Sequence, residues 1–219
     1  MKKENSGMTG RWKTLFVSNI KLWIFLAILL IAWGISAGVR REKDFRLQQG
    51  ISRQVLRFHV LANSDEDADQ AVKLQVRDGV LDWLEQKLTA EEQDRLELMS
   101  ERVEELLPDI EQKASEILRE NGFSYGVRAE LGSSRFPEKT YGNCTFPAGT
   151  YTALRIMLGE AKGHNWWCIL FPKLCFLDCV HAVLPQESEK QLQNVLTEEE
   201  YESLFDPAED TYKISFRYF

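Results

Sequence analysis

The sequence lacks the patterns that most directly assign a function. It has no internal repeat or low-complexity tract, which excludes a solenoid. The 34 Asp and Glu outnumber the 27 Lys and Arg, and no basic patch lies beyond residues 1–21, so we expect no nucleic-acid partner. The glycine-containing loop 159–165 lacks the Gly-Lys-Ser or Gly-Lys-Thr ending of a phosphate-binding loop. We therefore expect no nucleotide and no other small-molecule cofactor.

One long apolar run stands out against this background. Residues 22–39 carry no charged side chain, and as a helix they would reach about 27 Å, close to the thickness of a hydrocarbon core. The preceding segment is basic and contains a single acidic residue, Glu4. By the positive-inside rule, residues 1–21 stay in the cytoplasm and the rest of the chain crosses the membrane. Small residues at 36–38 also suit a signal peptidase, so the run is either a transmembrane segment or a signal peptide.

The exported part is expected to be one domain. Residues 40–50 are polar and charged and are interpreted as a juxtamembrane linker. The remaining residues, 51–219, are enough for one sizeable core but few for two. A buried core helix at 22–39 is the alternative to export, and it conflicts with the length and the basic flank of the run.

Apolar spacing predicts the elements of this domain. Residues 55–62 alternate as a half-buried strand, with Arg57 and His59 on the polar face. Ser64 or Asp65 is predicted to cap a helix whose apolar stripe extends to residue 88. A capping box at residues 89–92 predicts a second long helix, kinked at Pro108 and ended by residues 121–122.

The second half of the domain is predicted to be mostly β-structure. Strands are expected at 123–131 and 151–158, with a turn at 132–134 and a hairpin across 135–146. An acidic helix at 197–205 and a strand at 212–218 close the chain. The fold class is therefore α+β: an N-terminal membrane segment, then one compact domain with two long helices packed on a mostly antiparallel sheet.

Four cysteines in an oxidising compartment indicate disulfide bonding. Cys168 and Cys175 are the expected pair, because the loop between them is short and carries Pro172. Three alternatives remain open. In the first, the cysteines are buried free thiols. In the second, Cys168, Cys175 and Cys179 form a metal site with His181 and the nearby His164, although the sequence lacks a C-x-x-C zinc pattern. In the third, Cys168 is a nucleophile and a histidine is its base.

Two further stretches are candidates for recognition. His59 shares a strand face with Arg57 and points toward the loop 63–65. Together with Lys73, Arg77 and Asp78 it could form a polar cluster that binds a partner. The alternative is that His59 is a hydrogen-bonded residue beside the helix cap. Trp166 and Trp167 are adjacent and cannot both point inward. One of them is expected at the surface, where tryptophan is a good interface anchor, unless neighbouring segments cover both.

Several stretches together resemble stage II sporulation protein R of endospore-forming bacteria. They are RFHVLANSDEDADQAVKLQVRDGVL at 57–81, FPAGTYTALRIMLGEAKGHNWWCILFPKLCF at 146–176, and the basic N-terminus with one apolar segment. The resemblance implies a sporulation signalling protein, not an enzyme. In that family the protein is made in the forespore and acts from the forespore membrane, or secreted into the space between the two compartments. There it activates the mother-cell membrane aspartic protease that cuts the sigma-E precursor.

The resemblance also implies candidate partner-binding positions, none with a catalytic role. These are Arg57, His59, Asn63, Ser64, Asp65, Arg77, Asp78, Arg155, Asn165, Trp166 and Trp167. Cys144 and Cys179 lie outside the family pattern, so their state stays open. The alternative function is an extracytoplasmic hydrolase of cell-wall peptides that uses Cys168 and a histidine. For the signalling function, we expect the receptor patch on the loops 63–65 and 164–167.

Overall fold

The computed structural model describes residues 8–175, 184 and 186–205, with side chains from residue 22 onward. It divides into two compact units, Met1–Arg46 and Leu47–Phe219. The first unit consists of the greater part of helix α1 (Met8–Arg53). Its apolar stretch is long enough to cross a membrane, and none of that stretch is buried. Large apolar side chains such as Trp23, Leu30 and Trp33 are more than two-thirds exposed, which fits a membrane anchor or signal sequence and not a soluble core helix.

The second unit is built on a four-stranded sheet in the order β2-β5-β1-β6. These strands are β1 (Leu56–Leu61), β2 (Val127–Phe136), β5 (Gly149–Leu158) and β6 (Asn165–Phe171). β1 runs parallel to β5, and the other two pairings are antiparallel. β3 (Lys139–Tyr141) and β4 (Cys144–Phe146) form a separate hairpin joined at residues 142–143, as predicted.

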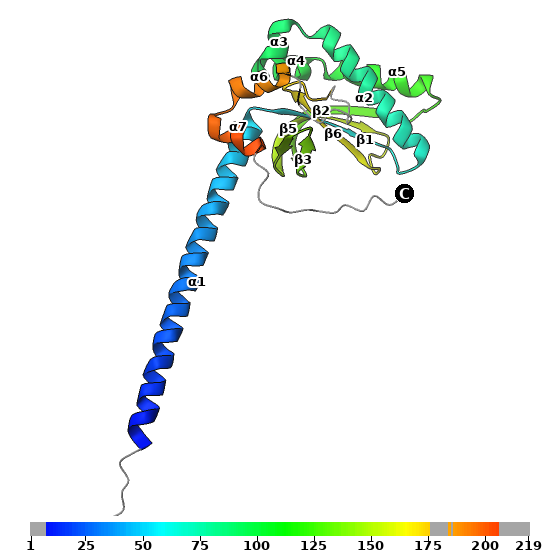
Figure 1. Ribbon diagram of the computed structural model, residues 1–219. Helices are drawn as coiled ribbons and strands as arrows, with labels where there is room; N and C mark the ends of the chain where they lie inside the picture. The colour runs from blue at the N-terminus through cyan, green and yellow to red at the C-terminus, as the bar shows by residue number, and fades with distance from the viewer. Residues whose placement is uncertain (1–7, 176–183, 185, 206–219) are drawn as a thin grey trace, which may run out of the picture. The chain divides into compact units, whose positions relative to one another are not determined.

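Helices cover the first face of this sheet (Figure 1). They are α2 (Asp67–Lys87), α3 (Ala90–Asp94), α4 (Leu96–Glu105) and α5 (Leu107–Glu120). Apart from Leu74, which is 36% exposed, the predicted apolar stripe of α2 is buried against alternate residues of β1, including Phe58 and Val60, so this face holds the larger core. The capping box at Thr89 is confirmed. The second helix is split twice, before α4 and again at Leu106, where Pro108 lies in the first turn of α5. The α+β fold class is confirmed.

The second face of the sheet is also covered along part of its length. The β3–β4 hairpin and the helices α6 (Gln186–Val195) and α7 (Glu198–Phe205) pack there in a second core. The prediction that β1 is half-buried is therefore wrong, because Arg57 and His59 are 0% and 4% exposed. An alternating strand pattern reports which residues share a face, but it does not report whether another layer covers the polar face.

Three local predictions need correction or lie outside the described residues. Residues 132–134 are not a turn, because β2 continues through them to Phe136. Neither Ser64 nor Asp65 caps α2, whose cap position is Glu66 without a side-chain hydrogen bond. The acidic helix near 197–205 is confirmed as α7, α6 was not predicted, and the strand expected at 212–218 lies outside the described residues.

Candidate functional site

The two loops that sequence analysis singled out lie against one another. The loop after β1 and the turn between β5 and β6 are about one hundred positions apart in sequence, yet they are joined through Asn63. Its side-chain oxygen accepts from the Glu160 backbone N–H at 2.9 Å, and its backbone oxygen accepts from the Lys162 N–H at 3.2 Å. The Gly163 N–H donates to the Ala62 oxygen at 3.0 Å. We call this pair of loops, residues 62–66 and 159–164, the loop junction.

Asp69 on α2 anchors the inner side of the loop junction. Its carboxylate accepts from the Asn63 amide at 2.8 Å, the Ser64 hydroxyl at 2.6 Å and the Tyr125 hydroxyl at 2.9 Å. Burial raises the pKa of Asp69, but these hydrogen bonds outweigh that effect and leave the pKa below its ordinary value. Asn63 and Ser64 therefore have structural hydrogen bonds to make. Asp69 was not among the candidates from the sequence, so this role was missed.

The outer side of the loop junction is formed by Asp65 and His164. One carboxylate oxygen of Asp65 accepts from the His164 backbone N–H at 2.6 Å and lies 2.5 Å from His164 Nδ1. Hydrogen bonds from the His164 side chain and backbone hold the pKa of Asp65 below its usual range. Lys73 donates to the His164 oxygen at 3.0 Å. The Asp65 and His164 side chains are 58% and 80% exposed, so a partner could reach them without rearrangement.

Trp166 lies next to the loop junction, on the helix-covered face of β6. The Arg77 guanidinium is stacked 4.1 Å from its ring centroid, and Arg77 donates to both carboxylate oxygens of Asp78, at 2.6 and 2.9 Å. Trp166 is half-buried at the edge of the larger core. Arg77, Asp78 and Trp166, all predicted candidates, are thus brought together. Trp166 follows His164 by two positions, and we take this group and the Asp65–His164 pair together as the candidate surface.

The second face of the sheet holds another group of candidates. His59 stacks on Trp167 with ring centroids 3.8 Å apart, and it is flanked by Phe136. Its register partner on β5 is Arg155, which is paired with Glu130 of β2. Trp166 and Trp167 therefore point to opposite faces of β6, and both are half-buried. Each ring packs against the core on its own face, so the alternative that neighbouring segments cover both is the better description, and neither tryptophan is fully exposed.

Because His59 is buried, we expect the free energy of unfolding to depend on pH. Burial lowers the pKa of His59 from 6.5 to about 4; the Asn165 side chain partly offsets this and the charge of Arg155 adds to it. Above pH 6.5 the imidazole is neutral in both states and has no effect. As the pH falls toward 4, the unfolded chain binds a proton that the folded domain does not, so the free energy of unfolding should fall by about 3 kcal/mol.

Urea unfolding of the second unit, residues 47–219, at pH 7 and pH 4 measures this loss. Carboxylates also titrate in this range, so the His59→Gln variant is the control, and its loss should be smaller than that of the wild type by the histidine contribution. Equal losses in the two proteins would show that His59 is not held neutral.

Arg57 is enclosed within the second core. Its guanidinium lies 4.3 Å from the Tyr151 ring centroid, with the Phe136 and Phe146 rings at 4.9 and 5.2 Å, and it donates to the Tyr141 hydroxyl at 3.2 Å. These are cation–π distances. Because Arg57 is fully buried, its position supports the fold and offers nothing to a partner surface.

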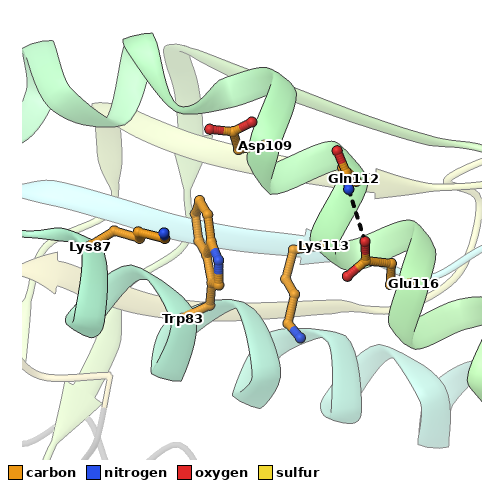
Figure 2. Close-up of a pocket in the computed structure, with 6 residues that line it drawn as sticks. All are labelled: Trp83, Lys87, Asp109, Gln112, Lys113 and Glu116. Carbon is orange, nitrogen blue, oxygen red and sulfur yellow. Dashed lines mark hydrogen bonds between the residues drawn. The ribbon is translucent and has the colours of Figure 1, made fainter.

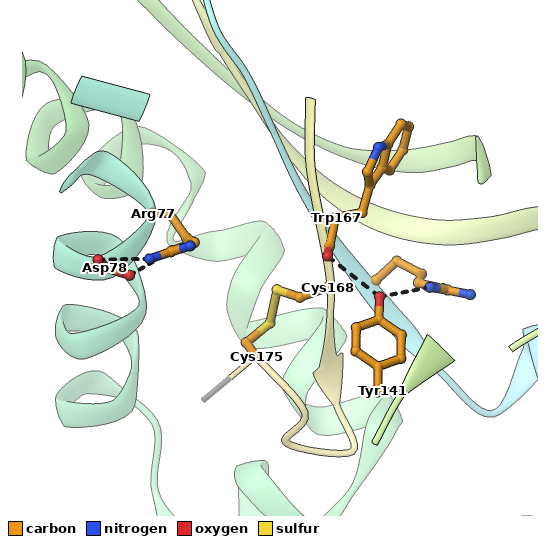
Figure 3. The surroundings of a disulfide bond; sticks show 7 residues. Arg77, Asp78, Tyr141, Trp167, Cys168 and Cys175 are labelled. Atoms are coloured by element: carbon orange, nitrogen blue, oxygen red, sulfur yellow. Dashed lines mark hydrogen bonds and ion pairs between the residues drawn. A yellow bond between two sulfur atoms is a disulfide. The ribbon is translucent and has the colours of Figure 1, made fainter. Parts of the chain in front are cut away.

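Cys168 and Cys175 form a disulfide with Cα atoms 5.1 Å apart, which confirms the predicted pair (Figure 3). Cys168 is thus neither a thiolate nucleophile nor a metal ligand, and this contradicts both of those alternatives for it. Cys144 is a buried free thiol whose pKa burial raises to about 12. Cys179 and His181 lie outside the described residues. Within the described ranges, no group of three His, Cys, Asp or Glu could hold a metal ion.

Removing this bridge should destabilise the second unit, residues 47–219. The loop that it closes is short, with a sequence separation of 7, and the loop-entropy relation gives roughly 2–3 kcal/mol. Cys168→Ser and Cys175→Ser should therefore lower the free energy of unfolding by similar amounts, as should dithiothreitol added to the wild type. A large loss in Cys168→Ser alone would instead indicate a separate role for that sulfur.

A polar groove of about 230 Å³ lies between α2 and α5, away from the loop junction (Figure 2). Trp83 stands between Lys87 and Lys113, and Gln112 donates to Glu116 at 2.9 Å. Asp109 completes the lining. None of these residues was a candidate from the sequence. The groove combines charges of both signs around one half-buried ring, without a buried polar group directed into it.

Comparison with known proteins covers the same region. A family model described as stage II sporulation protein R matches residues 52–181, from the start of β1 past the disulfide. Stage II sporulation protein R of Bacillus subtilis (strain 168) is 36% identical over 187 residues, which cover 79% of this chain and 81% of that protein. No solved structure matches. The chain therefore belongs to the stage II sporulation protein R family.

Proposed function

We propose that this protein is an exported sporulation signal that activates a membrane-embedded aspartic protease of the mother cell, the protease that processes the sigma-E precursor. Family membership supports the role in sporulation. The apolar stretch of α1, with a basic segment before it and the matched domain after it, supports export from the forespore. In this proposal the domain reaches the space between the two compartments, either anchored or released.

The proposed protein acts by binding and not by catalysis. A protein ligand activates a receptor only if it binds the active state more tightly than the inactive state, and this requires a defined surface. The loop junction together with Trp166 meets that requirement, because hydrogen bonds from both loops fix Asp65 and His164 at an exposed position. The observation that carries the proposal is that the family match includes this whole surface.

Co-production tests the proposal directly. A cell that does not sporulate would make the protease and the sigma-E precursor, with or without the full-length chain. Precursor cleavage should depend on the chain and should require residues 1–45, because a version without them stays in the cytoplasm. Cleavage of equal extent without the chain, or with the version confined to the cytoplasm, would overturn the proposal.

A further inference from the structure

Four side chains form a row across the second face of the sheet. Glu130 on β2 is the register partner of Arg155 on β5, Arg155 is the partner of His59 on β1, and His59 is the partner of Trp167 on β6. Register partners on neighbouring strands project from the same face, so these side chains lie side by side. We call them the cross-sheet row. It lies beyond the aromatic rings that enclose Arg57, toward the loop junction.

Two members of the cross-sheet row have polar atoms without partners. Among the described residues, neither ring nitrogen of the 4%-exposed His59 meets hydrogen-bond geometry, although the Asn165 side chain lies close enough to influence its pKa, and the buried Nε of Arg155 has no partner. Buried polar groups are nearly always paired, since an unpaired one loses its hydration without compensation. Adjacent unpaired groups on neighbouring strands therefore point to a ligand that supplies the missing bonds.

The hydrogen-bond donors of the row suit a carboxylate ligand. Arg155 is paired with Glu130, and both side chains are about one-third exposed, at 31% and 35%, so solvent and a partner can reach the pair. Arg128, two positions before Glu130 on the same strand, is also exposed, but it donates to the Met157 sulfur at 3.3 Å and is not a member of the row. A guanidinium donates well to a carboxylate, and a neutral imidazole has one N–H to donate. Trp167 forms an apolar wall beside them.

We propose that the cross-sheet row binds a carboxylate of an acidic peptide segment on the protein partner. The Arg155 guanidinium and the His59 imidazole donate to that carboxylate, and Glu130 is the internal carboxylate with which it competes. The inference rests on the proposed function in one respect, namely that the segment belongs to the receptor protease. It adds a second contact region on the sheet face opposite Trp166.

Binding of the full-length chain to protease-containing membranes is the first test. Arg155→Gln should reduce the retained amount at least tenfold, because it removes the cation that receives the carboxylate. Glu130→Gln should increase retention roughly threefold, because it removes the competitor. Arg128→Gln is the matched control for general charge and should change retention less than twofold. Equal losses in Glu130→Gln and Arg155→Gln, at unchanged melting temperature, would overturn the proposal, since the pair would then act as a unit.

The second test does not need the receptor. The His59 ring signals of the full-length chain in detergent micelles, assigned with His59→Gln, are followed while acetylated tetraglutamate amide is added. They should shift with this peptide, shift at lower concentration in Glu130→Gln, and not shift with the tetraglutamine equivalent. Equal responses to both peptides, or none, would refute carboxylate binding.

The two tests separate this inference from the proposed function. If the wild type does not bind protease-containing membranes but responds normally to the peptide, the protease is not the receptor, and the carboxylate site is still supported. If the wild type binds these membranes normally, but the peptide causes no shift and the variants do not differ, the carboxylate site is refuted and the protease is still supported as the receptor.

Discussion

Replacing Trp166 with alanine is expected to reduce cleavage of the sigma-E precursor at least tenfold while the exported body stays folded. Trp166 combines a half-buried indole with a stacked guanidinium from Arg77, beside the exposed Asp65 and His164. Aromatic residues at the centre of such surfaces carry most of the binding free energy in protein complexes. The measurement is precursor cleavage in cells that make the protease and the variant, at matched levels of protein.

Trp83→Ala is the matched control for this variant. Trp83 is also half-buried against the larger core and also has a cation near its ring, with Lys87 Nζ at 5.6 Å from the centroid. It lies in the groove between α2 and α5, outside the proposed surface. Its loss should have a comparable effect on the melting temperature and little effect on cleavage. Equal losses of cleavage would show that truncation of a large ring, and not its position, causes the defect.

Replacing Gly163 with alanine is expected to open the loop junction and to cost on the order of 4 kcal/mol of unfolding free energy. A Cβ atom there would lie 2.0 Å from the Ser64 backbone oxygen and 2.5 Å from its carbonyl carbon. Backbone cannot rotate away as a flexible side chain can, so the two loops would have to separate. The Gly163 hydrogen bond to Ala62 would be lost with them.

Chemical unfolding of the variant measures this cost, and Gly132→Ala in β2 is its control. No atom lies within 4 Å of a Cβ built at Gly132, so alanine should be neutral or slightly stabilising there. Hydrogen exchange at the amides of Lys162 and Gly163 should also become faster in Gly163→Ala. Unchanged stability and exchange in that variant would mean that the loops do not approach as closely as described.

The fold could be predicted from the sequence where the burial pattern is local. The apolar stripe of α2, the capping box at Thr89 and the hairpin at residues 142–143 all follow from short-range spacing, and all are confirmed. The layer on the second face could not be predicted in this way. It depends on α6, α7 and a hairpin that are distant in sequence from β1, and alternation within one strand does not reveal them.

The candidate site could be located from the sequence but not divided into roles. The resemblance to the family identified Asn63, Ser64 and Asp65 together, and it assigned no separate role to any of the three. In the structure the first two bind Asp69 within the loop junction, whereas Asp65 reaches the surface with His164. The division depends on side-chain partners that the strand pattern does not reveal: Asp69 is five or six positions away, and His164 is 99 positions away. Glu130 was missed for the same reason, since only the register with Arg155 shows its role.

The two arginines on the second face of the sheet also have different roles that the sequence does not reveal. Arg57 and Arg155 lie on the same face of the sheet, yet Arg57 is enclosed by aromatic rings and the Arg155 side chain is 31% exposed. Charge alone does not separate these cases, because the covering hairpin extends over only part of the face. A partner surface is therefore best tested with Trp166 and Arg155, and structural support with Arg57 and Gly163.

The most direct test of an external protein signal is to add the purified exported body, residues 47–219 with its disulfide intact, to the outside of cells that carry the protease and the sigma-E precursor. The account predicts that the precursor is cleaved, that the extent of cleavage rises with the added concentration, and that the Trp166→Ala body is inactive at the same concentrations. Absence of cleavage with a folded wild-type body, in cells where the co-produced full-length chain does cause cleavage, would contradict it.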